Sequence, residues 1–165
     1  MHADSRKTLL EKAGAILARR SLSRAELRDR IAAGADASLV EAVLDRLEQL
    51  RLLNDADYAY NFALHRVGRR GWGPAKVRDA LLGRRVAPDV ADAAIARACS
   101  ETDPRRALVE YTRRHVAKSG GAPDDKSARR LLAHLRRRGF EDDAIAGALK
   151  EVLPPELWRR LETGE

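Results

Sequence analysis

The stretch from Asp57 to Val86, DYAYNFALHRVGRRGWGPAKVRDALLGRRV, decides the fold of this chain. Its first apolar residues recur at three- and four-residue spacing, the pattern of one buried helix face; they are Tyr58, Ala59, Phe62, Ala63 and Val67. The spacing predicts a helix that ends at Gly68. Gly71-Trp72-Gly73-Pro74 then predicts a break, and its proline suits the first turn of a second helix. Val77 and Leu81 mark the buried side of that second helix.

Cationic side chains lie between and beside these apolar positions. They are Arg66, Arg69, Arg70, Lys76, Arg78, Arg84 and Arg85. A helix–break–helix so rich in positive charge indicates a surface that meets negative charge. For any single arginine, a solvated helix face remains the alternative interpretation.

The composition predicts an all-α protein. Hydrophobic residues make up 44% of the 165 residues and aromatic residues only 4%, so Leu, Val, Ile and Ala must fill the core. Ala and Leu are strong helix formers. No stretch alternates β-branched and polar residues in the way that strands require.

The pattern of the central stretch recurs along the chain. An offset of fifty residues places Leu27 on Val77, Ile31 on Leu81 and Val40 on Val90. An offset of fifty-four then places Val77 on Leu131, Leu81 on Leu135 and Val86 on Phe140. Self-similarity at a fixed period is the signature of a repeat architecture.

We therefore predict three tandem three-helix repeats, at 1–54, 55–103 and 104–165, the last with a C-terminal extension. Their first helices are expected at Thr8–Ala18, Ala56–Val67 and Arg105–Lys118. Repeats that contact mainly their neighbours form elongated, curved molecules with long concave faces. Such a shape suits binding along another extended object better than it suits a catalytic pocket.

The first repeat shows helix signals of its own. Ser23 and Glu26 are three residues apart and match the capping box that begins a helix. Gly34 is expected to end that helix, and Asp36 or Ser38 to open the third. Val40, Val43, Leu44, Leu47 and Leu50 form a continuous apolar stripe, which Asn54-Asp55 closes.

Signals of catalysis, cofactors and metals were sought and not found. Gly68-Arg-Arg-Gly-Trp-Gly73 resembles a phosphate-binding loop only superficially, because no buried strand precedes it and Pro74-Ala75 follows it. His2, His65, His115 and His134 do not pair at metal-ligand spacing, and each is expected to be a solvated or half-buried side chain. No serine or cysteine has a base nearby in sequence. We expect no enzyme, no cofactor and no metal.

The single cysteine, Cys99, excludes an intramolecular disulfide and is expected to fill core space. The first twenty residues carry too many charges for a secretory signal, and no apolar run approaches the length of a membrane span. We expect a monomeric cytoplasmic protein with no membrane contact.

The net charge of +7 favours a polyanionic partner. The candidate contact residues are Arg66, Arg69, Arg70, Trp72, Lys76, Arg78, Arg84, Arg85, Arg113, Arg114, Arg129, Arg130, Arg137 and Arg138. Trp72 stands in a glycine-rich turn, where it either stacks on a partner or packs back onto the protein. Both interpretations of Trp72 stay open at this point.

A family resemblance narrows the choice of partner. The central stretch resembles the signature of the RecX family of recombination regulators, through Asp57-Tyr58-Ala59, Phe62, Arg66, Arg70-Gly71, Gly73-Pro74, Lys76-Val77 and Leu81. Leu131-Leu132, Leu135, Arg137-Arg138-Gly139-Phe140 and Ile145 are similar to the C-terminal segment of the family. The first repeat agrees through Leu17-Ala18-Arg19-Arg20, Ser23 and Glu26-Leu27.

The chain departs from the family pattern at Gly83-Arg84-Arg85-Val86. The family commonly has glycine directly before the apolar residue, whereas this chain has Arg85. We therefore expect the turn to take another conformation.

The resemblance implies tandem three-helix repeats and a function. RecX-like proteins bind the RecA recombinase filament on single-stranded DNA, lie along its groove, and inhibit ATP hydrolysis, strand exchange or filament growth. They have no catalytic residues and no cofactor, and they belong to DNA repair, homologous recombination and the SOS response. The alternative is a basic helical module that binds single- or double-stranded DNA directly.

Overall fold

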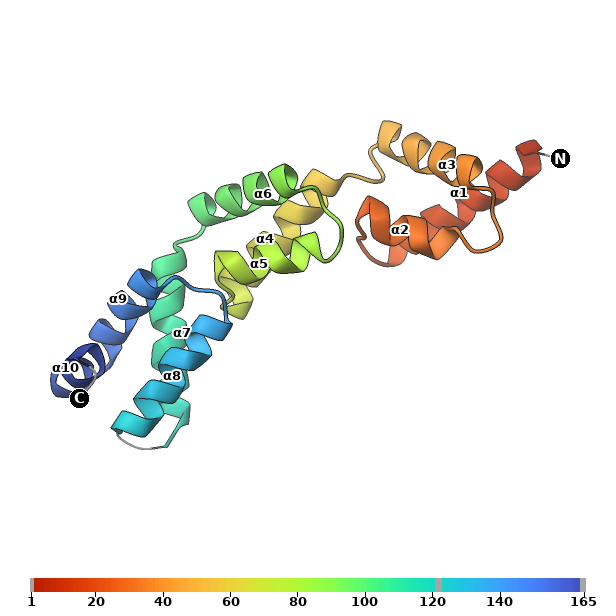
Figure 1. Cartoon of the computed structure of the whole chain (residues 1–165). Coiled ribbons are helices and arrows are strands. Elements are labelled where there is room, and N and C mark those ends of the chain that lie inside the picture. Colours follow the sequence, from red (N-terminus) through yellow and green to blue (C-terminus); the bar gives the residue numbers. More distant parts are fainter. Residues whose placement is uncertain (1, 121–122, 164–165) are drawn as a thin grey trace. The chain divides into compact units, whose positions relative to one another are not determined.

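The computed structural model describes residues 2–120 and 123–163, which contain α-helices and no strands (Figure 1). The helices are α1 (His2–Arg19), α2 (Arg24–Ile31), α3 (Ala37–Gln49), α4 (Asp55–Arg70), α5 (Pro74–Leu82), α6 (Pro88–Glu101), α7 (Pro104–Lys118), α8 (Asp125–Arg137), α9 (Asp142–Val152) and α10 (Pro155–Thr163). The prediction of an all-α fold with three successive three-helix repeats is confirmed. The residue boundaries between the repeats stay a prediction.

The chain divides into two compact units. The first unit combines residues 1–62 and 80–94, and the second combines 63–79 and 95–165. The division passes through the middle repeat, since α4, α5 and α6 each contribute to both units. In the first unit α1, α2 and α3 enclose a core built around Leu27, Leu44 and Leu47. In the second, α7 to α10 enclose a core built around Leu108 and Leu149.

Short polar side chains begin several helices. The capping box predicted for α2 is present, because the Glu26 N–H donates to Ser23 Oγ and the Ser23 N–H donates to the Glu26 carboxylate, both at 3.1 Å. Asp36 caps α3 in preference to Ser38. Asn54 starts α4, since its side-chain oxygen accepts the backbone N–H of Ala56 at 2.9 Å.

Two predicted helix ends are wrong by a few residues. α4 continues through Gly68 to Arg70, and the chain leaves the helix at Gly71, whose φ of +59° is available to glycine without strain. α3 ends at Gln49, so Leu50 lies beyond the helix and is 44% exposed rather than part of the buried stripe. Arg51 follows with φ +56° and turns the chain away.

The turn between the second and third helix of each repeat contains one residue with positive φ. These residues are Gly34 at +75°, Arg85 at +56° and Gly139 at +80°. The expectation that Arg85 would change the turn is therefore wrong. Arg85 takes the left-handed conformation itself, at a strain of about 1 kcal/mol for a residue with a Cβ atom.

The turn before α6 also corrects the repeat offset. The offset of fifty is right for the second helices, since Leu27, Ile31, Val77 and Leu81 are all fully buried. After the turn it is wrong by one residue, because Ala91 is fully buried while Val90 is only half-buried. Val40 therefore corresponds to Ala91, and the second repeat has a turn one residue longer.

The same type of contact between consecutive repeats occurs twice along the chain. In the first unit Ser23, which precedes α2, donates its hydroxyl hydrogen to the backbone oxygen of Arg84 at 2.7 Å. In the second unit Gly73, which precedes α5, donates its N–H to the backbone oxygen of Arg138 at 2.7 Å. In both, the start of a second helix binds the turn of the following repeat. We call these contacts the first and second joint.

The second joint requires glycine on both sides. A Cβ atom on Gly73 would lie 2.0 Å from the backbone oxygen of Gly139, and one on Gly139 would lie 2.4 Å from the backbone nitrogen of Lys76. Neither neighbour is a flexible side chain, so the backbones approach closely only because both residues lack side chains.

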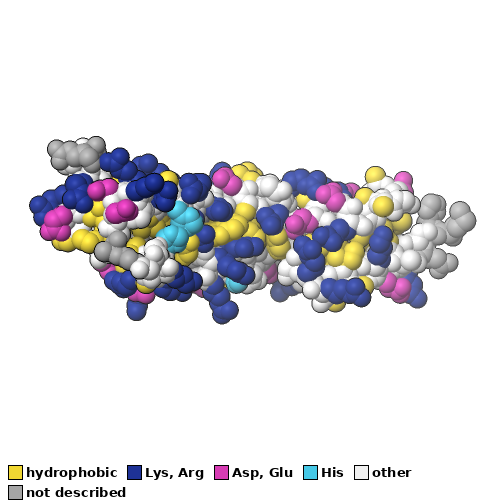
Figure 2. Space-filling view, turned by 90° about the horizontal axis from the view of Figure 1, so that it is seen from below, with side chains coloured by type: hydrophobic (Ala, Val, Ile, Leu, Met, Phe, Trp, Pro, Cys, Tyr) yellow, Lys and Arg dark blue, Asp and Glu magenta, His cyan; other side chains and the backbone are white. Residues whose placement is uncertain are grey.

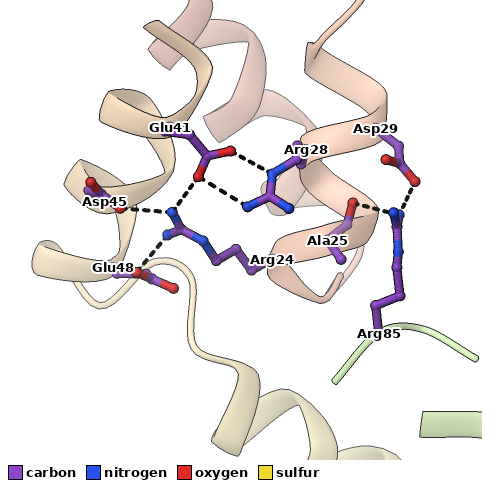
Figure 3. A network of polar contacts seen from close by, with 8 residues as sticks. All are labelled: Arg24, Ala25, Arg28, Asp29, Glu41, Asp45, Glu48 and Arg85. Carbon is purple, nitrogen blue, oxygen red and sulfur yellow. Dashed lines mark hydrogen bonds and ion pairs between the residues drawn. The ribbon is translucent and has the colours of Figure 1, made fainter. Parts of the chain in front are cut away.

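An ion-pair network surrounds the start of α2 (Figure 3). Arg24 contacts three carboxylates of α3, those of Glu41, Asp45 and Glu48, at 2.7–2.8 Å. Its backbone N–H donates to the Asp55 carboxylate at 2.7 Å, which links α2 to α4. Arg28, and then Arg24, hold the pKa of Glu41 below its usual value.

The Gly73→Ala variant is expected to destabilise the second unit. The new methyl group meets backbone atoms that cannot move independently, so we expect a loss of about 2 kcal/mol or more in the free energy of unfolding. Thermal unfolding followed by circular dichroism measures it. Gly14→Ala is the control, because its Cβ meets nothing within 4 Å inside α1 and should stabilise the chain. Equal melting temperatures for Gly73→Ala and the wild type would contradict the second joint.

The Arg24→Met variant is expected to lose about 1 kcal/mol at neutral pH, a value already reduced for solvent screening. A carboxylate with a lowered pKa contributes stability above its ordinary pKa, and that stability is lost as pH falls through the lowered value. The difference between variant and wild type should therefore shrink below about pH 4. Urea unfolding across pH tests it, with Arg30→Met on the same helix as control. A difference that stays constant with pH would contradict the network.

Candidate functional site

The net positive charge of the chain belongs to one of its two units. The first unit contains 12 Lys and Arg against 12 Asp and Glu, and the second contains 20 against 13. Of the candidate contact residues, Arg84 and Arg85 lie in the first unit. The others lie in the second: Arg66, Arg69, Arg70, Trp72, Lys76, Arg78, Arg113, Arg114, Arg129, Arg130, Arg137 and Arg138. The second unit is therefore the one able to attract a polyanion at long range.

The guanidinium groups of Arg84 and Arg85 are engaged in contacts within the first unit. The Arg84 guanidinium donates to the backbone oxygen of Ala80 at 2.7 Å, approaches Glu26 to 3.7 Å and lies over the ring of Phe62. Arg85 forms an ion pair with Asp29 and donates to the backbone oxygen of Ala25 (Figure 3). Both arginines thus reinforce the first joint.

Trp72 fits neither of its two sequence interpretations fully. Its indole is half-buried, and two cations lie over it: the Arg66 guanidinium carbon at 4.6 Å and Lys76 Nζ at 4.7 Å from the ring centroid. The backbone N–H of Trp72 also donates to the backbone oxygen of Arg66 at 3.1 Å. Cation–π attraction of this kind fixes the ring and both charged side chains around the break between α4 and α5.

Arg138 is a structural residue of the second joint. Its Nε donates to the backbone oxygen of Gly71 at 2.7 Å, and a terminal nitrogen donates to the backbone oxygen of Arg70. Its guanidinium carbon lies 4.4 Å from the ring centroid of Tyr111. Tyr111 in turn covers Gly71, where a Cβ would come within 2.6 Å of the tyrosine ring.

Two histidines come together in a way that the sequence did not indicate. The rings of His115 on α7 and His134 on α8 stack with centroids 4.8 Å apart, and the Tyr111 hydroxyl lies 2.9 Å from His134 Nε2. Burial lowers the pKa of His134, and the nearby His115 and Arg138 lower it further. Tyr111 and His115 are four residues apart on a helix and so share a face. That His134 on α8 meets this face depends on how the helices pack, which the sequence spacing does not show.

The remaining candidates differ in how far their charge is engaged. Arg113 pairs with Glu110 at 2.7 Å and Glu151 at 3.2 Å, and Arg114 donates to the backbone oxygen of Glu110. Arg78 is half-buried and Arg129 is exposed.

Four of the candidate contact residues are exposed and make neither an ion pair nor a side-chain hydrogen bond with the described residues; they are Arg69, Arg70, Arg130 and Arg137. Figure 2 shows histidine side chains gathered on one face, with Lys and Arg side chains beside them.

Residues 2–120 and 123–163 show no feature of a metal site or of a membrane span. No group of three or more His, Cys, Asp and Glu side chains in these ranges could hold a metal ion. None of the described helices combines the length and the apolar character that crossing a membrane requires. Cys99 is half-buried rather than fully buried, and its partial burial raises the pKa of the thiol.

The known proteins to which this chain is similar carry the same family name. A family model described as "RecX, second three-helix domain" matches residues 54–95. The chain is 33% identical to the regulatory protein RecX of Deinococcus radiodurans over 93% of this chain and 74% of the relative. It is 37% identical to the regulatory protein RecX of Pseudomonas putida (strain GB-1), over 81% of this chain and 84% of the relative.

A solved structure agrees with the fold. The crystal structure of RecX from Lactobacillus salivarius superimposes with a TM-score of 0.77 over 91% of this chain and 97% of that chain, at 18% identity. The structural match and the matches to the two relatives each cover more than four fifths of this chain. The chain belongs to the RecX family of regulatory proteins.

Proposed function

We propose that this protein regulates the RecA recombinase by binding the RecA–single-stranded DNA filament, and that it suppresses ATP hydrolysis, strand exchange or filament growth. Membership of the family gives the chain a regulatory role. The proposal adds the partner, which is the RecA filament, and the effect, which is inhibition. It places the protein in the cytoplasm, as a monomer, in DNA repair by homologous recombination and in the SOS response. No chemical step by the chain itself is needed.

The unequal charge of the two units carries this proposal. A RecA–DNA filament presents phosphate and acidic side chains, and the second unit has seven more Lys and Arg than Asp and Glu. Four of its candidate contact residues are exposed and make neither an ion pair nor a side-chain hydrogen bond with the described residues; they are Arg69, Arg70, Arg130 and Arg137. Arginines that are exposed and not engaged in internal ion pairs can bind a partner without first breaking contacts that stabilise the fold.

The remaining candidates have a supporting role in this proposal. Arg66 and Lys76 hold the ring of Trp72, and Arg138 holds the second joint. These three residues therefore position the binding surface and are not its main contact residues. Arg84 and Arg85 are matched by Glu26 and Asp29 and belong to the first joint.

The DNA-dependent ATPase of RecA tests the proposal directly. Addition of the wild-type protein at substoichiometric concentration is expected to lower the steady-state rate. An unchanged ATPase rate and unchanged strand exchange across a broad titration would overturn the proposal.

The exposed arginine pair at the end of α4 should carry part of the effect. We expect Arg69→Glu with Arg70→Glu to weaken inhibition about tenfold or more, because four units of charge change on the binding surface. The control is Arg19→Glu with Arg20→Glu, an equally exposed pair at the end of α1 in the neutral unit. Equal loss in both variants, with both still folded, would show that net charge matters and that this surface does not.

A further inference from the structure

A pocket lies between α7 and α8 in the second unit. The residues that matter for its chemistry are His115 on α7 and Arg130, His134 and Arg137 on α8. Leu131 and Ala128, both buried, form part of its apolar lining. Nothing in the regulatory role above requires a pocket at this place.

The lining of this pocket is positively charged. Arg130 and Arg137 are exposed and make no ion pair within the described residues. The one lining carboxylate, Asp124, accepts the N–H of Ser127 at 2.8 Å as the cap of α8, and Ser127 lowers its pKa. An anion in this pocket would therefore meet two guanidinium groups and a single carboxylate, which is already hydrogen-bonded at the start of α8.

Two aromatic rings of similar orientation, those of His115 and His134, line this pocket, and the ring of Tyr111 stacks with both. His115 and His134 stack with an angle of 21° between their planes, and the Tyr111 ring lies 12° from His134 and 27° from His115. His115 is exposed, whereas Tyr111 and His134 are half-buried and hold one another through the 2.9 Å contact. An exposed ring fixed in this way offers a flat face on which another ring can stack.

His134 can also supply charge. Burial lowers the pKa of its imidazole, and the groups that face it lower it further; they are His115 from α7, Arg138 and Arg137 at the end of α8, and Lys76 from α5. Tyr111 from α7 also faces His134, through its hydroxyl. An anion in the pocket reverses this balance and favours protonation.

We propose that this pocket binds a phosphate group of a single-stranded nucleic acid. Arg130 and Arg137 contact the phosphate, His115 offers its ring to the neighbouring base, and protonation of His134 strengthens the complex. The site acts without RecA, so it goes beyond the regulatory function proposed above.

The combination of groups favours nucleic acid over an acidic peptide. Guanidinium groups bind phosphate and carboxylate alike. Parallel rings beside them add a contact that only a ligand with unpaired bases can use, and every base has a face suited to it. A duplex keeps its bases stacked inside and cannot use that contact.

Fluorescence anisotropy with a labelled oligothymidine, in the absence of RecA, tests the proposal. The wild-type affinity is expected to be about three- to tenfold higher at about pH 6 than at about pH 8, at equal salt. His115→Gln with His134→Gln should remove this pH dependence and match the wild type at the higher pH. Arg137→Gln should weaken binding at both. His65→Gln, an exposed histidine on α4, is the control and should behave as wild type.

Two further measurements keep the outcome decisive. Imidazole NMR signals of the wild-type protein are expected to shift on oligonucleotide addition for His115 and His134 and not for His65, whether or not any variant folds. The proposal is overturned by unshifted His115 and His134 signals, by a duplex that binds as tightly as the single strand, or by polyglutamate that competes as well as the oligonucleotide. RecA ATPase inhibition can persist in each of these cases.

Discussion

The contact on which the structure depends is the joint between the start of a second helix and the turn of the next repeat. Ser23 forms it with the backbone oxygen of Arg84, and Gly73 forms it with that of Arg138. The acceptor is a backbone group in both, so the hydrogen bond does not depend on the side chain of the accepting residue, which is arginine in each case. Repeats with little sequence identity can therefore be linked in the same way. Each joint also satisfies a polar group that burial would otherwise leave without a partner.

The two joints are reinforced by different interactions, and this difference separates the two units in charge. The first uses ion pairs, with Arg84 and Arg85 beside Glu26 and Asp29, which keeps that unit neutral overall. The second uses close backbone approach at Gly73 and Gly139, together with Arg138 bound to backbone oxygens. Since backbone oxygens do not cancel a full charge, Arg138 contributes to the net positive charge of the second unit. The exposed Arg69 and Arg70, which precede this joint in the chain, make no ion pair with the described residues and stay available for a partner.

Much of this fold could be predicted from local sequence signals. Ser23 with Glu26 gave the start of α2, Pro74 gave the start of α5, and the repeated apolar spacing gave the helical repeats. The left-handed conformation of Arg85 could not be predicted, because its tertiary contacts with Asp29 and Ala25 override the local preference of arginine. The one-residue difference in turn length displaced the predicted register from Ala91 to Val90, because an offset taken from the second helices does not record an insertion in the turn.

The sequence could predict that the candidate site is positively charged, but not which residues its side chains contact. Sequence alone could find the arginines, but not that Arg138 faces Gly71 or that Arg85 faces Asp29. The stacking of His134 on His115 likewise depends on how α8 packs near α7. Hydrogen–deuterium exchange of the protein with and without RecA filament tests the central claim most directly. We expect protection around the Trp72 break and along α8, with α1 to α3 unchanged. Protection confined to α1 to α3 would contradict binding through the second unit.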